Sequence, residues 1–272
     1  MSFLQNILRI FDLRMEQPTP YGWFHLISLV LTVGLTVFLC LRCRDAAPRQ
    51  IRRLVLWTAV TVVILEVYKQ INFGFSYEDG ITFDYAWYAF PFQFCSTPMY
   101  IGLLAGLTRK GAVHRAACAY LATYSVFAGI CVMLYPVTVF VETIGINFQT
   151  MVCHGSMIVI GIYLLCSGYV KLEHRTILRA MPVFAVCVLL AATMNEIAHL
   201  TGLLETDTFD MFFISPYCEP SLPVYSLVQG IVPFPWCLFI YVLGFTLAAY
   251  LVLLAAMGVS ALVRKRQVKQ PV

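Results

Sequence analysis

Residues 21–44 read YGWFHLISLVLTVGLTVFLCLRCR, an apolar run that ends in two closely spaced arginines. A stretch of about twenty apolar residues is long enough to cross the hydrocarbon core of a bilayer as a helix. A cleavable signal peptide has a shorter apolar core and a small-residue cleavage site instead of arginines. The stretch therefore predicts a helix that stays in the membrane.

The overall composition also favours a bilayer. Of the 272 residues, 60% are apolar and 12% are charged, and the mean hydropathy is +0.81, whereas soluble domains carry about 25% charged residues. No polar linker divides the chain, so we expect one membrane domain over residues 1–272. Most of the ten cysteines fall in apolar runs, where we expect free thiols.

Six further apolar runs predict an all-α, polytopic bundle of seven transmembrane helices. In the third span, Pro98 is expected to cause a kink, because proline lacks the N–H that a helix interior needs. The expected spans are residues 21–41, 54–73, 90–107, 116–135, 150–172, 181–203 and 234–262.

The distribution of basic residues predicts the orientation. Fifteen of the eighteen lysines and arginines fall in alternate connections and in the C-terminal tail, and cytoplasmic segments carry such an excess. With seven spans, this places the N-terminus outside and the C-terminus inside. The basic tail is explained by this rule, so we expect no nucleic-acid partner and a location in the cell membrane.

Polar side chains within the spans gather toward the predicted outer side. Such groups are costly in a bilayer and usually face a cavity or a partner. We interpret them as a site in the outer leaflet, and the alternative is that they hold the helices together by hydrogen bonds. They are His25, Glu66, Lys69, Gln93, Cys95, His154, Asn195, Glu196 and His199.

Two pairs have a spacing that places them on one helix face. Glu66 and Lys69 either contribute to a binding site or form an internal ion pair. Glu196 could hold His199 in one tautomer and raise its basicity. The three histidines could instead converge on one metal ion, but zinc motifs with paired histidines are missing. We expect neither a metal nor another cofactor.

Cys95 is a candidate nucleophile, because a thiol becomes reactive when a base such as His154 removes its proton. The alternative is a small buried cysteine without chemistry. Gln93 could donate hydrogen bonds to an oxyanion, and His25, Glu66, Lys69 and Asn195 complete the expected substrate-binding set. The proline-rich connection over residues 204–233 could cover the site as a lid or form an ordinary interfacial loop.

Several short motifs carry a family resemblance. The segments WFHLIS at residues 23–28, FPFQFCS at residues 90–96 and CHG at residues 153–155 occur in that order. Together with residues 162–165, they resemble the motifs of the YwaF-type bacterial integral membrane proteins. The resemblance covers about residues 20–240 and implies the plasma membrane of a bacterium.

That family is similar to a eukaryotic membrane protein implicated as an acyltransferase acting on ether phospholipids. The resemblance therefore implies lipid acyl chemistry, with His154 at the position of the family histidine. The eukaryotic motif is Pro-Cys-His-Leu, and this chain has Phe92 at the cysteine position and Gln93 at the histidine position. Cys95 lies three residues after Phe92, about 300° round a helix, and so projects in a different direction.

Three functions remain open at this stage. The first is an enzyme that transfers or hydrolyses an acyl group of a membrane lipid, with His154, Cys95, His199 and Glu196 as its catalytic residues. The second is a transporter of small solutes, and the third is a non-catalytic accessory protein. A transporter should carry polar residues through both halves of the bundle, and the inner half of this chain has few.

Overall fold

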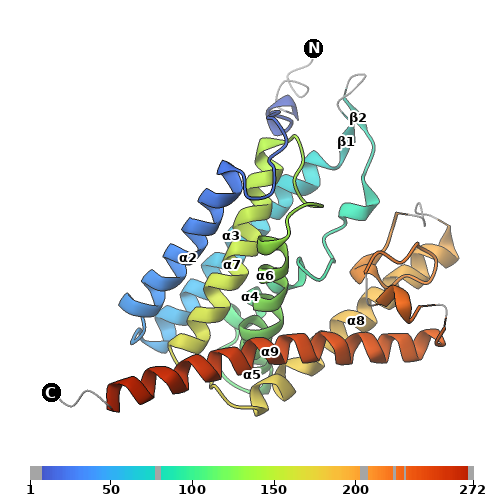
Figure 1. The fold of residues 1–272 in the computed structure, drawn as a ribbon. Coiled ribbons are helices and arrows are strands. Elements are labelled where there is room, and N and C mark those ends of the chain that lie inside the picture. The colour runs from blue at the N-terminus through green and yellow to red at the C-terminus, as the bar shows by residue number, and fades with distance from the viewer. Residues whose placement is uncertain (1–7, 77–80, 203–207, 223–224, 230, 269–272) are drawn as a thin grey trace.

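The computed structural model describes residues 8–76, 81–202, 208–222, 225–229 and 231–268. Within these ranges, six helical segments are long and apolar enough to cross a membrane, so the expectation of a multi-pass helical bundle is confirmed (Figure 1). The six segments are α2 (Trp23–Arg42), α3 (Pro48–Asn72), the continuous run α5–η2–α6, α7 (Ile144–Cys166), α8 (Arg175–Thr201) and α9 (Phe234–Val268).

The third of these segments is interrupted by a π-helical turn. It consists of α5 (Ala112–Tyr120), the turn η2 (Leu121–Ser125) and α6 (Val126–Leu134). The remaining elements are short: the antiparallel pair β1 (Phe75–Ser76) and β2 (Thr82–Phe83), the helix α4 (Thr97–Leu107) and the 3-10 turns η1 (Trp87–Ala89), η3 (Met211–Phe213) and η4 (Tyr225–Leu227).

Two ends can be distinguished in the part of the bundle that contains α2, α3 and α7, and α9 runs across its lower part (Figure 1). The segment before α2 and the β1–β2 hairpin lie at one end of the bundle, which we call the hairpin end. The α2–α3 connection and the C-terminal end of α9 lie at the opposite end. This arrangement agrees with the alternation of basic connections.

The expected third span, residues 90–107, is only partly helical. Helix α4 begins at Thr97 and is too short to be counted with the six long segments. Pro98 lies in its first turn, where no N–H is needed, so the expected kink within a helix is wrong. The Thr97 hydroxyl donates to the Phe94 carbonyl at 2.9 Å and holds the irregular segment before the helix.

Two other expected spans are displaced along the chain. Helix α7 begins at Ile144 and ends at Cys166, six residues earlier at both ends than expected, and Gly168 follows with a φ of +71°. A left-handed glycine just beyond a helix is a common terminator. Helix α8 begins at Arg175 and retains Pro182 inside it, and it ends before Gly202, whose φ is +58°.

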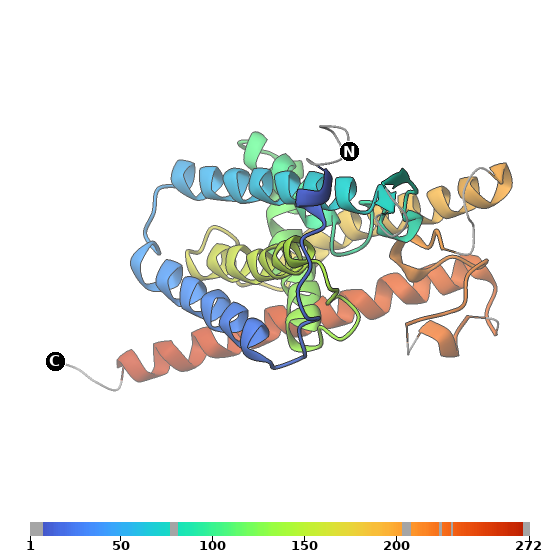
Figure 2. The same cartoon turned by 90° about the horizontal axis from the view of Figure 1, so that it is seen from above.

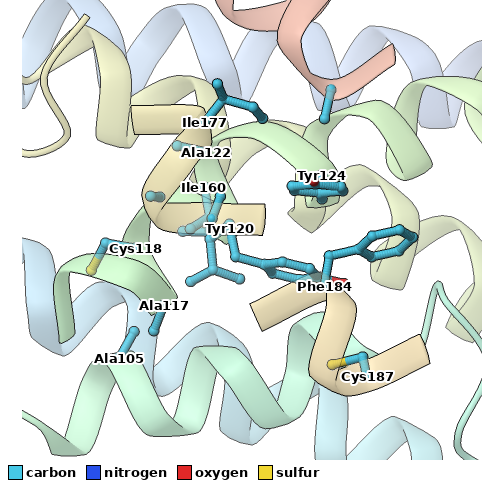
Figure 3. Close-up of a cluster of buried hydrophobic side chains, with 14 of the residues drawn as sticks. Ala105, Ala117, Cys118, Tyr120, Ala122, Tyr124, Ile160, Ile177, Phe184 and Cys187 are labelled. Atoms are coloured by element: carbon cyan, nitrogen blue, oxygen red, sulfur yellow. The ribbon is translucent and has the colours of Figure 1, made fainter. Parts of the chain in front are cut away.

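Helix α7 and the α5–η2–α6 run occupy the centre of the bundle. In each, 72% of the most apolar window is buried, compared with 11% in α2. Figure 2 shows α7 between α2 and α3, and it packs against both. Stacked rings of Tyr120, Tyr124 and Phe184 join the central run to α8, with centroids 5.4 and 4.6 Å apart (Figure 3).

Candidate functional site

His154 lies deep in the bundle on α7. It is ten residues from the start of the helix, about 15 Å at 1.5 Å per residue, which is deeper than the one turn expected from sequence. Its Nδ1 lies 2.8 Å from the carbonyl oxygen of Thr150. A carbonyl only accepts, so Nδ1 carries the proton and Nε2 has a free lone pair. Nε2 is buried and has no partner within the described ranges.

A neutral imidazole with a fixed tautomer and an unused lone pair can act as a general base. The Thr150 carbonyl sets the tautomer of His154, and burial keeps water from competing for Nε2. The role of His154 as a proton acceptor stays a prediction, with which this geometry agrees.

Cys95 reaches the same region from the irregular segment before α4. The Sγ of Cys153, which directly precedes His154, lies 3.9 Å from the carbonyl oxygen of Cys95. Both cysteines are free and contact a small apolar cluster that includes Val62 and Met157. The fold thus brings the segment carrying Cys95 against the turn of α7 that carries His154.

Glu66 and Lys69 form an internal ion pair, as one of the two sequence interpretations predicted. Lys69 Nζ lies 2.7 Å from Glu66 Oε1, and the side chains are 16% and 7% exposed. Gln70 Nε2 donates to the same oxygen at 2.7 Å, and Gln149 Nε2 donates to the other carboxylate oxygen at 3.1 Å. The carboxylate is therefore fully coordinated, and it links α3 to α7.

The ion pair and His154 are linked through α7, because Gln149, which donates to Glu66, lies five residues before His154 on that helix. Sequence reasoning missed Gln149, because the expected fifth span began at Thr150 and left Gln149 outside it. The apolar pattern that continues back to Ile144 was the available signal.

Gln93 and Asn195 bind backbone rather than an open cavity. Asn195 accepts from the Met211 N–H at 2.8 Å and donates to the Met211 carbonyl at 3.0 Å. Gln93 donates to the Asp210 carbonyl at 2.8 Å and accepts from the Phe212 N–H at 2.9 Å. Both side-chain amides thus hold the segment 210–212 against the bundle. Their donors and acceptors, which we had assigned to an oxyanion or a substrate, are used in these bonds.

His25 is buried and also serves the backbone. Its Nδ1 accepts from the Tyr21 N–H at 2.9 Å, so its Nε2–H donates to the Met133 carbonyl, also at 2.9 Å. Both ring nitrogens are used, and the side chain ties the start of α2 to the end of α6. The structure therefore shows His25 as a link between helices.

Glu196 and His199 lie near the C-terminal end of α8, where Tyr217 contacts both. The Tyr217 hydroxyl donates to Glu196 Oε2 at 2.7 Å, and the Tyr217 ring stacks on His199 with centroids 3.4 Å apart. His199 is exposed. These residues form an aromatic and hydrogen-bonded contact on an element different from the one that carries His154.

A small cavity lies beside Cys153, between α3, α4, η2 and α7. Its volume is about 30 Å³, enough for about two water molecules. Hydroxyl groups of Thr58, Ser125 and Ser156 line it together with Cys153 and apolar side chains of α3 and α4. Over the described part of the chain, no group of three potential metal ligands occurs.

The helical segments define a multi-pass membrane protein, and a cluster of polar side chains is buried within it. The family model for the TMEM164 family matches residues 20–255, and the chain therefore belongs to the TMEM164 family. Comparisons with curated proteins and with solved structures found no match. The match supports a membrane protein family, and it does not extend to the YwaF type or a bacterial origin.

Proposed function

We propose that this protein transfers or hydrolyses an acyl group of a membrane lipid, with His154 as general base and Cys95 as nucleophile. The observation that supports it most is the buried, unused Nε2 of His154, whose proton is fixed on the other ring nitrogen by Thr150. A purely structural histidine would be expected to use both nitrogens, as His25 does.

The reaction would proceed in two steps. His154 Nε2 takes the proton of the Cys95 thiol, and the thiolate attacks the ester carbonyl of a lipid. The ester C–O bond breaks, and the leaving alcohol takes the proton from His154. In the second step, the hydroxyl of another lipid or a water molecule gives its proton to His154 and attacks the thioester. The proton then returns to the Cys95 sulfur.

The resemblance of the sequence motifs to those of a eukaryotic lipid acyltransferase implies the same chemistry, with one departure. Phe92 stands where the eukaryotic motif has its cysteine, and its ring packs on Phe212 with centroids 6.0 Å apart. An aromatic side chain cannot act as nucleophile, so Cys95 takes that role in this proposal. Glu66 and Lys69 would stay paired and hold the geometry of the site.

The proposal includes the topology. The six long segments, together with α4 and the segment before it, would make seven crossings, with the N-terminus and the hairpin end outside. The alternation of basic connections supports this orientation. Reporter fusions at the N-terminus and in the α2–α3 connection would test it. An N-terminus in the cytoplasm, or an α2–α3 connection outside the cell, would refute it.

The test of the chemistry is lipid mass spectrometry of cells that lack the protein and carry either the wild type or a variant. His154→Asn retains a donor for the Thr150 carbonyl but removes the Nε2 lone pair. We expect it, like Cys95→Ser, to abolish the wild-type change in acyl composition at normal protein level.

The matched control is His174→Ala. His174 is exposed and lies outside the bundle core, where its Nδ1 is 2.6 Å from the Tyr250 hydroxyl. We expect this variant to behave as the wild type. If His154→Asn retains the full lipid change, the protein does not use His154 as base, and a transporter or accessory protein becomes the better explanation.

A further inference from the structure

A second cavity lies between α9, α6 and the connection that precedes α9. Its volume is about 310 Å³, compared with about 30 Å³ for the cavity beside Cys153. We call it the α9 groove. Its lining includes Phe127, Tyr225, Val228, Ile240, Gly244 and Phe245.

The lining of the α9 groove is almost entirely apolar. The residues of α9 recur every three or four positions from Ile240 to Ala248, so the groove follows the helix for about 12 Å. Apolar cavities of this kind exclude water and accept hydrocarbon. The long shape along a membrane-spanning helix matches an extended hydrocarbon chain better than a compact ligand.

One polar group lies at the end of the groove near the start of α9. Tyr225 is 6% exposed, and its hydroxyl has no hydrogen-bond partner within the described residues. The neighbouring Tyr241, in contrast, donates its hydroxyl to the Phe212 carbonyl at 2.9 Å. A buried, unpaired hydroxyl is costly. The Tyr225 ring lines the groove, and its hydroxyl is enclosed by the protein.

The groove also lies next to the proposed reaction site. Phe245 of the groove contacts the ring of Phe94 with centroids 5.3 Å apart, and Phe94 directly precedes Cys95. Helix α9 packs against α6, which brings Phe127 to the groove (Figure 1). One aromatic pair therefore separates the chain-shaped cavity from the segment that carries the thiol.

From this geometry we infer that the α9 groove binds one acyl chain of a membrane phospholipid. The chain would extend from Tyr225 along α9 past Gly244. Its assignment as a substrate chain rests on the proposed function, whereas its binding in the groove does not.

The experiment uses the full protein in nanodiscs of phosphatidylethanolamine and phosphatidylglycerol, with a trace of phosphatidylcholine that carries a photoreactive diazirine in its acyl chain. After illumination, the labelled residues are mapped by mass spectrometry. We expect labelling of residues 240–248 to exceed that of the exposed face of α2, which includes Val30 and Leu31 and reports contact with bulk lipid.

Gly244 offers a matched pair of variants. A Cβ added at Gly244 or at Gly258 meets nothing within 4 Å, and both glycines are exposed on α9. Only Gly244 lines the groove. Each lost methylene contact weakens binding about fourfold, so Gly244→Leu should reduce groove labelling by about tenfold or more. Gly258→Leu should leave it unchanged.

Groove labelling no stronger than on α2, or equal labelling in the Gly244→Leu and Gly258→Leu variants, would overturn the inference. The His154→Asn variant separates it from the proposed function. If the His154→Asn variant shows normal groove labelling and cells that carry it have the wild-type lipid profile, chain binding is supported and the proposed acyl chemistry is refuted. If His154→Asn abolishes the cellular lipid change but the wild type shows no excess labelling in the groove, only the inference that the groove binds an acyl chain is refuted.

Discussion

Removing one partner of the Glu66–Lys69 pair should destabilise the protein far more than removing both charges together. In the Glu66→Gln variant, the Lys69 ammonium remains 16% exposed without its carboxylate, and Gln149 loses the charge on its acceptor. Breaking a buried ion pair from one side costs about 3–5 kcal/mol. For a chain of this size we expect the midpoint of thermal unfolding to fall by about 10 °C.

The double variant Glu66→Gln/Lys69→Met removes both charges and keeps the volumes similar. Replacing a whole buried pair by neutral groups is often close to neutral for stability. We therefore expect the double variant to regain most of the lost stability, with a coupling energy of at least about 3 kcal/mol, since residues in direct contact are not additive.

The assay is thermal unfolding of the purified protein in detergent, followed by intrinsic fluorescence, for the wild type, both single variants and the double variant. A loss below about 1 kcal/mol in Glu66→Gln would show that the pair is solvated like a surface ion pair. Strictly additive losses in the double variant would show that the two side chains act independently, and either result would refute the reasoning.

Three further predictions concern stability. Burial raises the pKa of Asp210 from 3.8 to about 6, so the native state retains a proton that the unfolded chain releases. Protonation of Asp210 therefore contributes about 1–2 kcal/mol to the free energy of unfolding, a value reduced for partial exposure. This contribution is complete below about pH 4 and is lost as the pH rises through 6. Asp210→Asn should flatten this part of the unfolding profile. Gly161→Ala should lower the free energy of unfolding by about 1–3 kcal/mol, because the added methyl meets the carbonyl oxygen of Leu121 in η2. Gly258→Ala, where the added methyl meets nothing, should raise it by up to about 1 kcal/mol. Asn195→Leu removes both bonds to Met211 and should increase hydrogen exchange over residues 208–217 without unfolding the helices.

The apolar runs predicted the long helices because each run must bury its own backbone polar groups in a helix to cross a bilayer. The ends were less predictable. Pro98 reads as a kink in an apolar run, but it also suits a helix start, and only the packing of the preceding segment selects the second reading. The left-handed Gly168 ends α7 inside what the sequence presents as a continuous span.

The candidate site was predictable where the contacts are local. The spacing of Glu66 and Lys69 indicates an ion pair, since three residues place both on one helix face. The roles of Gln93 and Asn195 could not be read in the same way. Their partners are backbone groups of residues 210–212, and for Gln93 these lie more than a hundred positions further along the chain.

The five-residue turn η2 changes how this part of the chain tolerates insertions and deletions. In a π-helical turn the hydrogen bonds join residues five positions apart instead of four, so the turn holds one more residue than an α-helical turn. Deleting a single residue there would restore uniform helix and rotate everything from Val126 onward by about 100° relative to α5. Gly129, whose missing side chain lets α7 approach, would then point elsewhere. Homologues should therefore conserve the length of this segment more strictly than its amino acids.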